Sequence, residues 1–198
     1  MSALASSETP VTGATMHERI VEAAVRLTSE VGWSQVTMAK LADRVGVSRQ
    51  TVYNEIGTKP RLAEAMILTE LDSFLGLVTL AFDEHRTDLV EAIRAASRGV
   101  LEQAKDNPLL HAVVSATHGA DTELLPLLTT HAEPLLSAAK TVVRERMTSY
   151  DVQLDAHRLD AAIDMVVRVV LSHVMAPTAS STDTSESIAW IAERVLRG

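Results

Sequence analysis

The stretch LADRVGVSRQTVYNEIG, residues 41–57, decides the fold of the N-terminal part of this chain. Gly46 permits a tight turn between two short helical patterns, and Val47 can plug that turn with an apolar side chain. Ser48 is placed to cap the following helix, which lasts until Gly57. Two short helices joined by a turn of about three to four residues that contains glycine make a helix-turn-helix.

The second of these helices has an apolar and a polar face. Val52 and Ile56, four residues apart, can face the neighbouring helices. The outward side chains are then Arg49, Gln50 and Asn54, with Thr51 and Tyr53 at the edges. Arginine and amide side chains read base edges by paired hydrogen bonds, so the pattern favours a helix presented to a DNA major groove. A solvated polar face is the alternative, because helix, glycine, helix occurs in many proteins.

Two earlier helices complete the N-terminal unit. Thr15 and Glu18 form a capping-box pattern, followed by apolar residues at helical spacing up to Gly32. Thr37 can cap a second helix that ends near Val45. We therefore expect a three-helix domain over residues 15–62.

Four separated blocks of this region carry a family resemblance. They are GWSQVTMAKLA (32–42), VGVS (45–48), TVY (51–53), and Lys59 with Leu62 three residues on. In this register the sequence resembles the tetracycline-repressor (TetR) family of transcriptional regulators. The family usually has Phe where Ile56 stands and often His where Asn54 stands, so no operator sequence can be borrowed from it.

The resemblance implies which side chains touch DNA. Thr37, Tyr53 and Lys59 would contact phosphates, together with the N-terminal backbone amides of the fourth helix. Base reading would fall to the outward face of the third helix. The full set of DNA-binding candidates is Thr37, Ser48, Arg49, Gln50, Thr51, Tyr53, Asn54 and Lys59.

Composition points to packed helices. The chain has 198 residues, of which 46% are hydrophobic and only 3% aromatic, and Gly and Pro are scarce. This is enough to bury a large core in one or two domains. Cysteine is absent, so disulfides and thiolate chemistry are excluded.

The net charge of −8 hides a split along the chain. Residues 15–62 hold seven basic and five acidic residues, whereas residues 63–198 hold 11 basic and 20 acidic ones. Salt screening limits the reach of a charge to about 8 Å, so an acidic body is compatible with a DNA-binding head.

The sequence shows no sign of membrane targeting. Residues 1–14 lack a basic start and a sustained apolar run, so we expect a flexible tail and no signal peptide. The most apolar segment, 165–175, carries Arg168 and His173 and is shorter than the roughly 18 to 20 residues that a membrane span needs. We expect a soluble, cytoplasmic protein without membrane contact.

The acidic remainder, residues 63–198, has helical patterns throughout. The expected segments are 61–84, 87–107, 109–116, one or two helices within 122–147, 155–174 and 182–196, the last capped by Asp183 and Glu186. Together with the head they give an all-α fold of about nine helices. We interpret residues 63–198 as a ligand-binding and dimerisation domain.

Two C-terminal segments have more apolar surface than one subunit can cover. Residues 163–174 are apolar on nearly every side, and residues 188–196 show the same excess. In the TetR family the two C-terminal helices form a four-helix dimer interface. We predict a symmetric homodimer on a palindrome-like DNA site; the alternative is that these helices form the centre of a monomer.

The resemblance also implies a small-molecule pocket among the middle helices. The candidates are Phe74, Leu77, Val78, Leu101, His111, Val114, His118, Leu128 and Met165, each of which can equally be plain core. The near absence of aromatic and charged residues around them favours a lipophilic ligand, including a long-chain one.

Metal and catalytic motifs are missing from the sequence. It contains no H-x-x-x-H or H-E-x-x-H pair, glycine-rich phosphate loop or G-x-S-x-G elbow. His111 and His118 would lie about 10 Å apart along a helix, too far to share an ion. We expect no metal, no cofactor and no enzymatic activity.

The hypothesis is therefore a dimeric, ligand-responsive regulator, a repressor in preference to an activator. It binds a double-stranded DNA operator and is released by a small, lipophilic effector. The rivals are an activator of the same fold, a helical partner-binding module, and an all-helical enzyme with a histidine beside Asp121 or Asp164.

Overall fold

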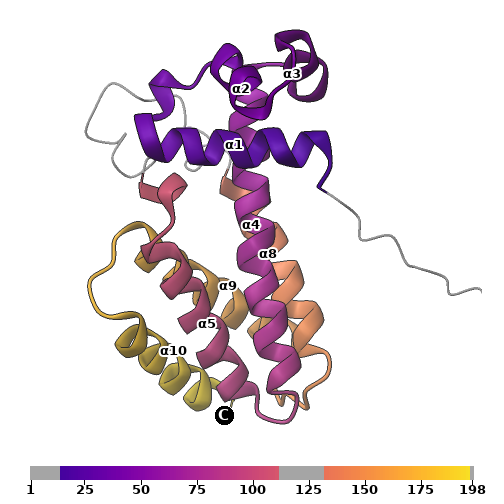
Figure 1. The fold of residues 1–198 in the computed structure, drawn as a ribbon. Coiled ribbons are helices and arrows are strands. Elements are labelled where there is room, and N and C mark those ends of the chain that lie inside the picture. The colour runs from indigo at the N-terminus through magenta and orange to yellow at the C-terminus, as the bar shows by residue number, and fades with distance from the viewer. Residues whose placement is uncertain (1–13, 112–131, 197–198) are drawn as a thin grey trace, which may run out of the picture.

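The computed structural model describes residues 14–111 and 132–196, and these residues contain helices and no strand (Figure 1). Nine helical elements are described: α1 (Met16–Val31), the 3-10 helix η1 (Trp33–Gln35), α2 (Met38–Val45), α3 (Arg49–Ile56), α4 (Lys59–Glu84), α5 (Leu89–Lys105), α8 (Ala132–Met147), α9 (Ala156–Met175) and α10 (Ser181–Leu196). The all-α expectation is confirmed. Most of the tail and of the helix expected at 109–116 lies outside the described residues.

The head consists of α1, α2, α3 and the first part of α4. Its buried apolar residues include Ile20, Ala24, Leu41, Val52, Leu62 and Met66. Each helix begins where the sequence supplies a capping oxygen. Thr15 and Glu18 form the capping box of α1, Thr37 accepts from the Lys40 backbone N–H, and Ser48 accepts from that of Thr51.

The turn between α2 and α3 depends on Gly46. Its φ of 77° lies in the left-handed region, where a side chain would strain the backbone. The backbone N–H groups of Gly46 and Val47 both donate to the Ala42 carbonyl, which closes the end of α2. Val47 is half-buried against the head core, as the sequence predicted.

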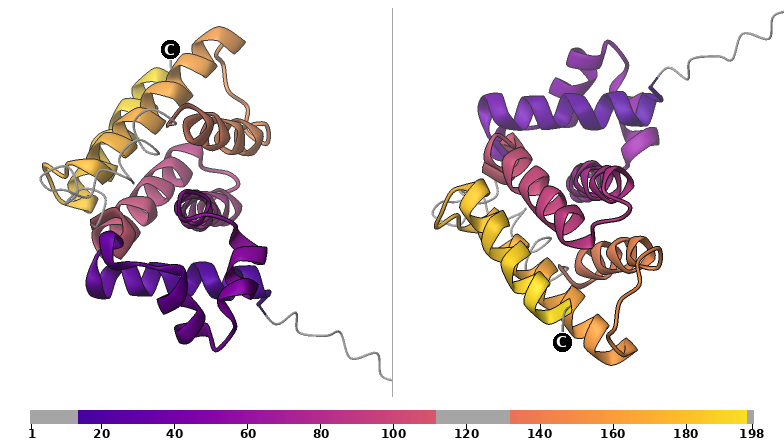
Figure 2. Two further views of the ribbon diagram at one scale, coloured as in Figure 1. Left: turned by 90° about the horizontal axis from the view of Figure 1, so that it is seen from above. Right: turned by 90° about the horizontal axis from the view of Figure 1, so that it is seen from below.

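The body is a bundle of α4, α5, α8, α9 and α10. In it α5 packs against both α4 and α10, and α9 packs against α8 and α5 (Figures 1 and 2). Its core includes Phe82, Ala92, Ile93, Ile163, Val167 and Ile188. Tyr150 closes one end: its ring meets Phe82 edge to face, and its hydroxyl donates to the carbonyls of Phe82 and His85. Burial raises the pKa of this phenol.

Helix α4 belongs to both units. Leu62, Ala63, Met66 and Ile67 lie in the head core, while Ala81 and Phe82 lie in the body core. Within the described ranges, α4 is the one helix whose length and composition suit a membrane span. Packing at both ends of α4 accounts for its apolar composition.

The start of α10 differs from the prediction. The helix begins at Ser181, and Ser180 caps it by accepting from the Asp183 N–H at 3.0 Å. The Ser180 hydroxyl also donates to the Asp183 carboxylate at 2.6 Å. The expected cap by Asp183 and Glu186 is therefore wrong by one turn, and Glu186 instead accepts from Arg94 Nε on α5.

A charged cluster joins α8 to α9. Asp164 accepts from Arg168 Nε at 2.7 Å and from Lys140 Nζ at 2.9 Å. These two hydrogen bonds hold the pKa of the Asp164 carboxyl below its usual range. All three side chains are partly exposed, so solvent screening limits the contribution of these two ion pairs to stability.

We predict that Asp164 gives the body part of its acid sensitivity. A lowered folded-state pKa means that the stabilisation is present above the unfolded-state pKa and is lost as pH falls through the folded-state pKa. Asp164→Asn should therefore lower the urea midpoint at neutral pH and flatten its fall below about pH 4. Asp151→Asn, which removes a carboxylate hydrogen-bonded to Gln153, is the control. If the urea midpoint of Asp164→Asn fell as steeply below about pH 4 as that of the wild type, the prediction would be contradicted.

Candidate nucleic-acid interface and apolar cavity

Helix α3 is fixed to the head by its apolar side and presents its polar side to solvent. Val52 and Ile56 are buried in the head core. Arg49, Gln50 and Asn54 are exposed, and α3 lies at the outer end of the molecule, away from the body (Figure 1). The structure thus brings together the three outward side chains that the sequence selected.

Two of these side chains order each other. Gln50 Nε2 donates to Asn54 Oδ1 at 2.8 Å, one helical turn apart. This bond fixes which way the two amides face and leaves the Gln50 oxygen and the Asn54 NH₂ group free to act as acceptor and donor. Ser48 is occupied differently: its oxygen caps α3 and meets the Thr51 hydroxyl at 2.9 Å. Its contact with DNA stays a prediction.

The predicted phosphate-binding side chains surround α3. Thr37 is exposed at the start of α2, and Tyr53 is exposed on α3. Lys59 begins α4, with its Nζ 4.7 Å from the centre of the Trp33 ring. This contact holds the lysine head group at the start of α4, where the first backbone N–H groups have no partner within the helix.

Sequence reasoning missed the residue that starts α4. Thr58 is its N-cap and accepts from the Arg61 N–H. A threonine two residues before Pro60 is a recognisable start signal, because proline is tolerated in the first turn. Helix α4 therefore begins two residues before the expected helix at 61–84, and its first backbone N–H groups lie correspondingly earlier in the sequence.

One ion pair braces the head. Arg44 on α2 donates to both carboxylate oxygens of Glu30 on α1, at 2.9 and 2.6 Å. The guanidinium lowers the pKa of the Glu30 carboxyl, and the carboxylate raises that of Arg44. Arg44 is thereby tied to the scaffold, in contrast to Arg49 on α3.

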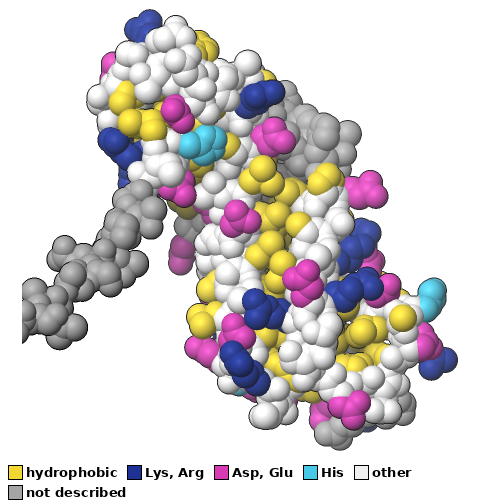
Figure 3. All heavy atoms as spheres, turned by 90° about the vertical axis from the view of Figure 1, so that its right-hand side faces the viewer, with side chains coloured by type: hydrophobic (Ala, Val, Ile, Leu, Met, Phe, Trp, Pro, Cys, Tyr) yellow, Lys and Arg dark blue, Asp and Glu magenta, His cyan; other side chains and the backbone are white. Residues whose placement is uncertain are grey.

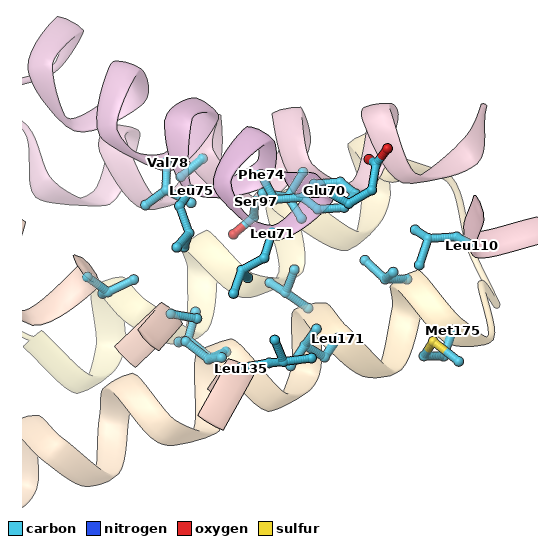
Figure 4. Close-up of a pocket in the computed structure, with 18 of the residues that line it drawn as sticks. Glu70, Leu71, Phe74, Leu75, Val78, Ser97, Leu110, Leu135, Leu171 and Met175 are labelled. Atoms are coloured by element: carbon cyan, nitrogen blue, oxygen red, sulfur yellow. The ribbon is translucent and has the colours of Figure 1, made fainter. Parts of the chain in front are cut away.

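The body contains a cavity of about 190 Å³ with almost entirely apolar walls (Figure 4). Its walls come from α4, α5, α8, α9 and the turn after α5, and include Leu71, Phe74, Leu75, Val78, Val100, Leu135, Val170 and Leu171. The polar lining residues are Glu70 and Ser97. From the right-hand side of Figure 1, hydrophobic side chains form a band along the body with charged groups beside it (Figure 3).

The predicted ligand-binding residues divide into four groups. Phe74 and Val78 line this cavity, whereas Leu101 and His111 line a neighbouring hollow. Leu77 turns toward Gly99 on α5 and lines neither. Met165 is 62% exposed and also lines neither. The remaining three, Val114, His118 and Leu128, lie outside the described residues.

The wall residues that were missed had a signal in the sequence. Leu71 and Leu75 share the apolar face of α4 with Phe74 and Val78, at helical spacing. The periodicity identifies that face but not which part of it is covered by packing and which part borders empty space. Which part of the face borders empty space depends on how α5, α8 and α9 pack against α4.

Helices α9 and α10 carry large apolar side chains that their own subunit leaves exposed. On α10 these are Trp190, 59% exposed, Ile191, 51% exposed, and Val195; on α9 they are Met165 and Leu171. The two helices pack against each other in the body. Among the described residues, no group of three or more His, Asp or Glu side chains could hold a metal ion.

A capped helix-turn-helix with a polar outward face, carried on a helical body, places the protein in the class of helix-turn-helix regulators. A family model described as bacterial regulatory proteins, tetR family, matches residues 20–66. Another, the C-terminal domain of the bacterial tetracyclin repressor, matches residues 88–194. The chain belongs to the TetR family of transcriptional regulators.

Individual relatives agree with this assignment. The HTH-type transcriptional regulator AlkX of Mycobacterium tuberculosis is 26% identical over 176 residues, which is 89% of this chain and 82% of that protein. The crystal structure of AlkX from Dietzia sp., a TetR family repressor implicated in biodegradation of n-alkanes, superposes with a TM-score of 0.74 at 26% identity. It covers 90% of this chain and 96% of that one. The nucleoid occlusion factor SlmA of Vibrio cholerae is 35% identical over 99 residues, half of each chain.

Proposed function

We propose that this regulator is a repressor that binds a palindrome-like operator as a homodimer and is released by a small lipophilic effector. The observation that carries the proposal is the pairing of an exposed, donor-rich α3 with an apolar cavity in the same chain. The first suits a DNA groove and the second suits a hydrocarbon. The repressor named in the Dietzia structure supports the choice of repression over activation.

DNA binding is assigned to α3 and the helix starts around it. Gln50 and Asn54 are ordered by their mutual hydrogen bond, so reading a base edge would cost them less conformational entropy than free side chains. Arg49 at the first position of α3 is exposed beside them. Lys59 and Thr37 would fix the register on the phosphates.

Dimer formation is assigned to α9 and α10. A monomer rarely leaves so many large apolar side chains exposed on adjoining helices, and a partner's identical surface would cover them. A twofold axis there would present two α3 helices to half-sites about 34 to 36 Å apart.

The effector is assigned to the cavity because its walls match a hydrocarbon. With Glu70 and Ser97 as the described polar lining residues, the cavity has few groups that could bind a polar ligand, and filling it would gain apolar burial. The link of the Dietzia relative to n-alkane biodegradation supports a lipophilic effector here.

The cavity and the head share wall residues. Ile67, Leu109 and Leu135 line the cavity and also pack in or against the head core. Asn107 strengthens this junction: its Nδ2 donates to Glu70 on α4 at 2.5 Å, and its Oδ1 accepts from the Leu110 N–H. A ligand that moves these walls must also move the contacts that hold the head, which couples occupancy to DNA affinity.

Footprinting on the DNA upstream of the gene tests the proposal. We expect protection of one palindrome-like site at protein concentrations far below those that coat random DNA, with binding that weakens steeply as salt rises. Addition of a straight-chain hydrocarbon ligand should remove the footprint. Equal affinity for the site and for random DNA would argue against sequence-specific regulation.

Substitutions at Gln50 and Lys59 should separate the two kinds of DNA contact. Gln50→Ala should relax sequence choice by about 1–3 kcal/mol at one base pair of each half-site, because a paired hydrogen bond to the base is lost. Lys59→Ala should weaken binding to all sequences and lower the salt slope by about one. Titrations on operator and random DNA at several salt concentrations measure both effects.

Arg86→Ala is the control for Lys59→Ala, because it removes one exposed positive charge in the body, far from α3. It should change neither affinity nor salt slope. If Gln50→Ala weakened operator and random DNA by the same factor, the base-reading role of Gln50 would be wrong.

A further inference from the structure

A second hollow, of about 280 Å³, adjoins the apolar cavity. The two share three lining residues, Leu110, Val174 and Met175. Figure 4 places Leu110 and Met175 together at one end of the apolar cavity. The flexible thioether of methionine adapts easily to a ligand, so Met175 can give way at this boundary. The hollow therefore borders the space in which the effector is proposed to bind.

The lining of the hollow differs in kind from that of the cavity. Lys105 at the end of α5, His111 and His173 all line it, and its described lining includes no Asp or Glu. The His111 ring donates to the Lys105 carbonyl, and His173 Nδ1 donates to the Val169 carbonyl at 2.9 Å. These bonds hold both imidazoles in place, and the Nε2 of His173 is left for another partner.

The N-terminus of α10 faces the same hollow. Ser181, the first residue of α10, and Thr184 one turn later are among its lining residues. Ser180 satisfies the Asp183 N–H, whereas the first N–H groups of any helix lack a partner within that helix. The positive end of the helix dipole therefore lies beside the hollow, although Asp183 in the same turn offsets part of it.

Two residues at this helix start, Ser181 and Thr184, are buried in the fold and line the hollow. Ser181 is only 4% exposed and Thr184 only 5%. Neither hydroxyl makes a side-chain hydrogen bond to another described residue, although nearby serines such as Ser180 and Ser185 do. Both hydroxyls are therefore able to donate a hydrogen bond to a polar group in the hollow.

We propose that the cavity and the hollow form one binding site for a straight-chain amphiphile with an anionic head, of which a long-chain carboxylate is the simplest. The hydrocarbon lies in the apolar cavity, and the carboxylate lies in the hollow against Lys105, His173 and the start of α10. The inference rests on the proposed function, because it names the chemical class of that effector.

The reverse orientation, with the carboxylate in the apolar cavity and the hydrocarbon chain in the hollow, is unfavourable. Inside the apolar cavity a carboxylate would find no cation among the described lining residues, and Glu70 would repel it. A buried charge without a partner is costly, whereas Lys105 and the hydroxyls of Ser181 and Thr184 would pair with it in the hollow. A bare alkane would fill the cavity but would offer no acceptor to these hydroxyls.

Calorimetric titration of the full-length protein with decanoate and decan-1-ol tests the proposal, since these probes share a chain and differ in the head. Wild-type protein should bind decanoate about ten times more tightly, the usual scale for charge-assisted hydrogen bonds. The double variant Lys105→Gln with His173→Gln should lose that preference by weakening decanoate alone. The double variant Arg158→Gln with His157→Gln, at the opposite end of α9, makes the same chemical changes and should behave as wild type.

The possible results separate this inference from the proposed function. If wild-type protein binds both probes equally, or if the hollow variant weakens both by the same factor, the anionic head site is overturned while a lipophilic effector stands. If neither probe binds, both the carboxylate site in the hollow and the lipophilic effector are overturned. Gel shifts with each bound probe then show whether its binding also releases the operator, which is the separate claim of the proposed function.

Discussion

Trp190→Asp combined with Ile191→Asp is expected to produce a monomer that no longer binds the operator at concentrations where wild-type protein saturates it. Both side chains are more than half exposed on α10, and beyond them Val195 is exposed as well. In a twofold interface each would be covered by the partner, so a carboxylate at either position would be buried without a cation. The substitution should therefore remove the interface and spare the subunit.

The effect on DNA binding should exceed the effect on folding. In the proposed dimer, the second α3 would meet its half-site at a high effective concentration, and losing it should weaken operator binding about 10²- to 10⁴-fold. Within its own subunit Trp190 stacks with the Arg194 guanidinium at 5.8 Å, a surface contact. The monomer should therefore remain folded, which circular dichroism can verify.

Sedimentation measures the change of mass, and a gel shift on a palindromic site measures the loss of affinity. Leu68→Asp combined with Leu80→Asp is a matched control, because both residues are large, exposed and apolar but lie on α4. It should remain a dimer. A wild-type protein that sediments as single molecules would refute the assignment of α9 and α10 as the interface.

Leu109→Ala is expected to destabilise the head, although Leu109 follows α5 in the sequence. Its side chain is 2% exposed and belongs to the same cluster as Ile20, Leu41 and Val52. Truncating a buried leucine to alanine typically costs about 2–5 kcal/mol, from lost burial and the remaining cavity. We expect a loss of that size in the free energy of unfolding, measured by urea denaturation with head and body probes.

Leu110→Ala is the matched control, since the neighbouring leucine is half-buried and faces the cavity and the hollow. Its stability loss should be clearly smaller. Equal losses in the two variants, or a loss confined to body probes, would show that Leu109 does not anchor the head.

The local structure of the head was predictable because each signal lies within a few residues of its effect. Thr37 and Ser48 cap the helices that follow them, and Gly46 turns the chain where a left-handed φ is needed. The apolar spacing of Val52 and Ile56 then determines which side of α3 is outward. These features depend on hydrogen bonds between near neighbours and on helical periodicity, both of which the sequence displays.

The contacts between distant segments were not predictable in this way. Leu109 looks like any apolar residue of the body, and nothing in its neighbourhood indicates the head core as its partner. The cavity has the same character: of the residues chosen as ligand-binding candidates, Phe74 and Val78 line it, whereas Met165 is exposed on α9. The remaining error concerned the start of α10, where two residues could cap the helix. Ser180 is the cap, because its hydroxyl oxygen accepts from the Asp183 N–H.

The single unbroken helix α4 turns small displacements into large ones. Its 26 residues span about 39 Å at the usual rise of 1.5 Å per residue. If the end in the body acts as the pivot of a lever, a tilt of about 5° shifts the other end by about 3 Å, close to one base-pair step of DNA. With two such arms in a dimer, the shifts would combine. In the proposed dimer, an ångström-scale widening of the space beside Phe74 would therefore be enough to bring both halves of an operator out of register.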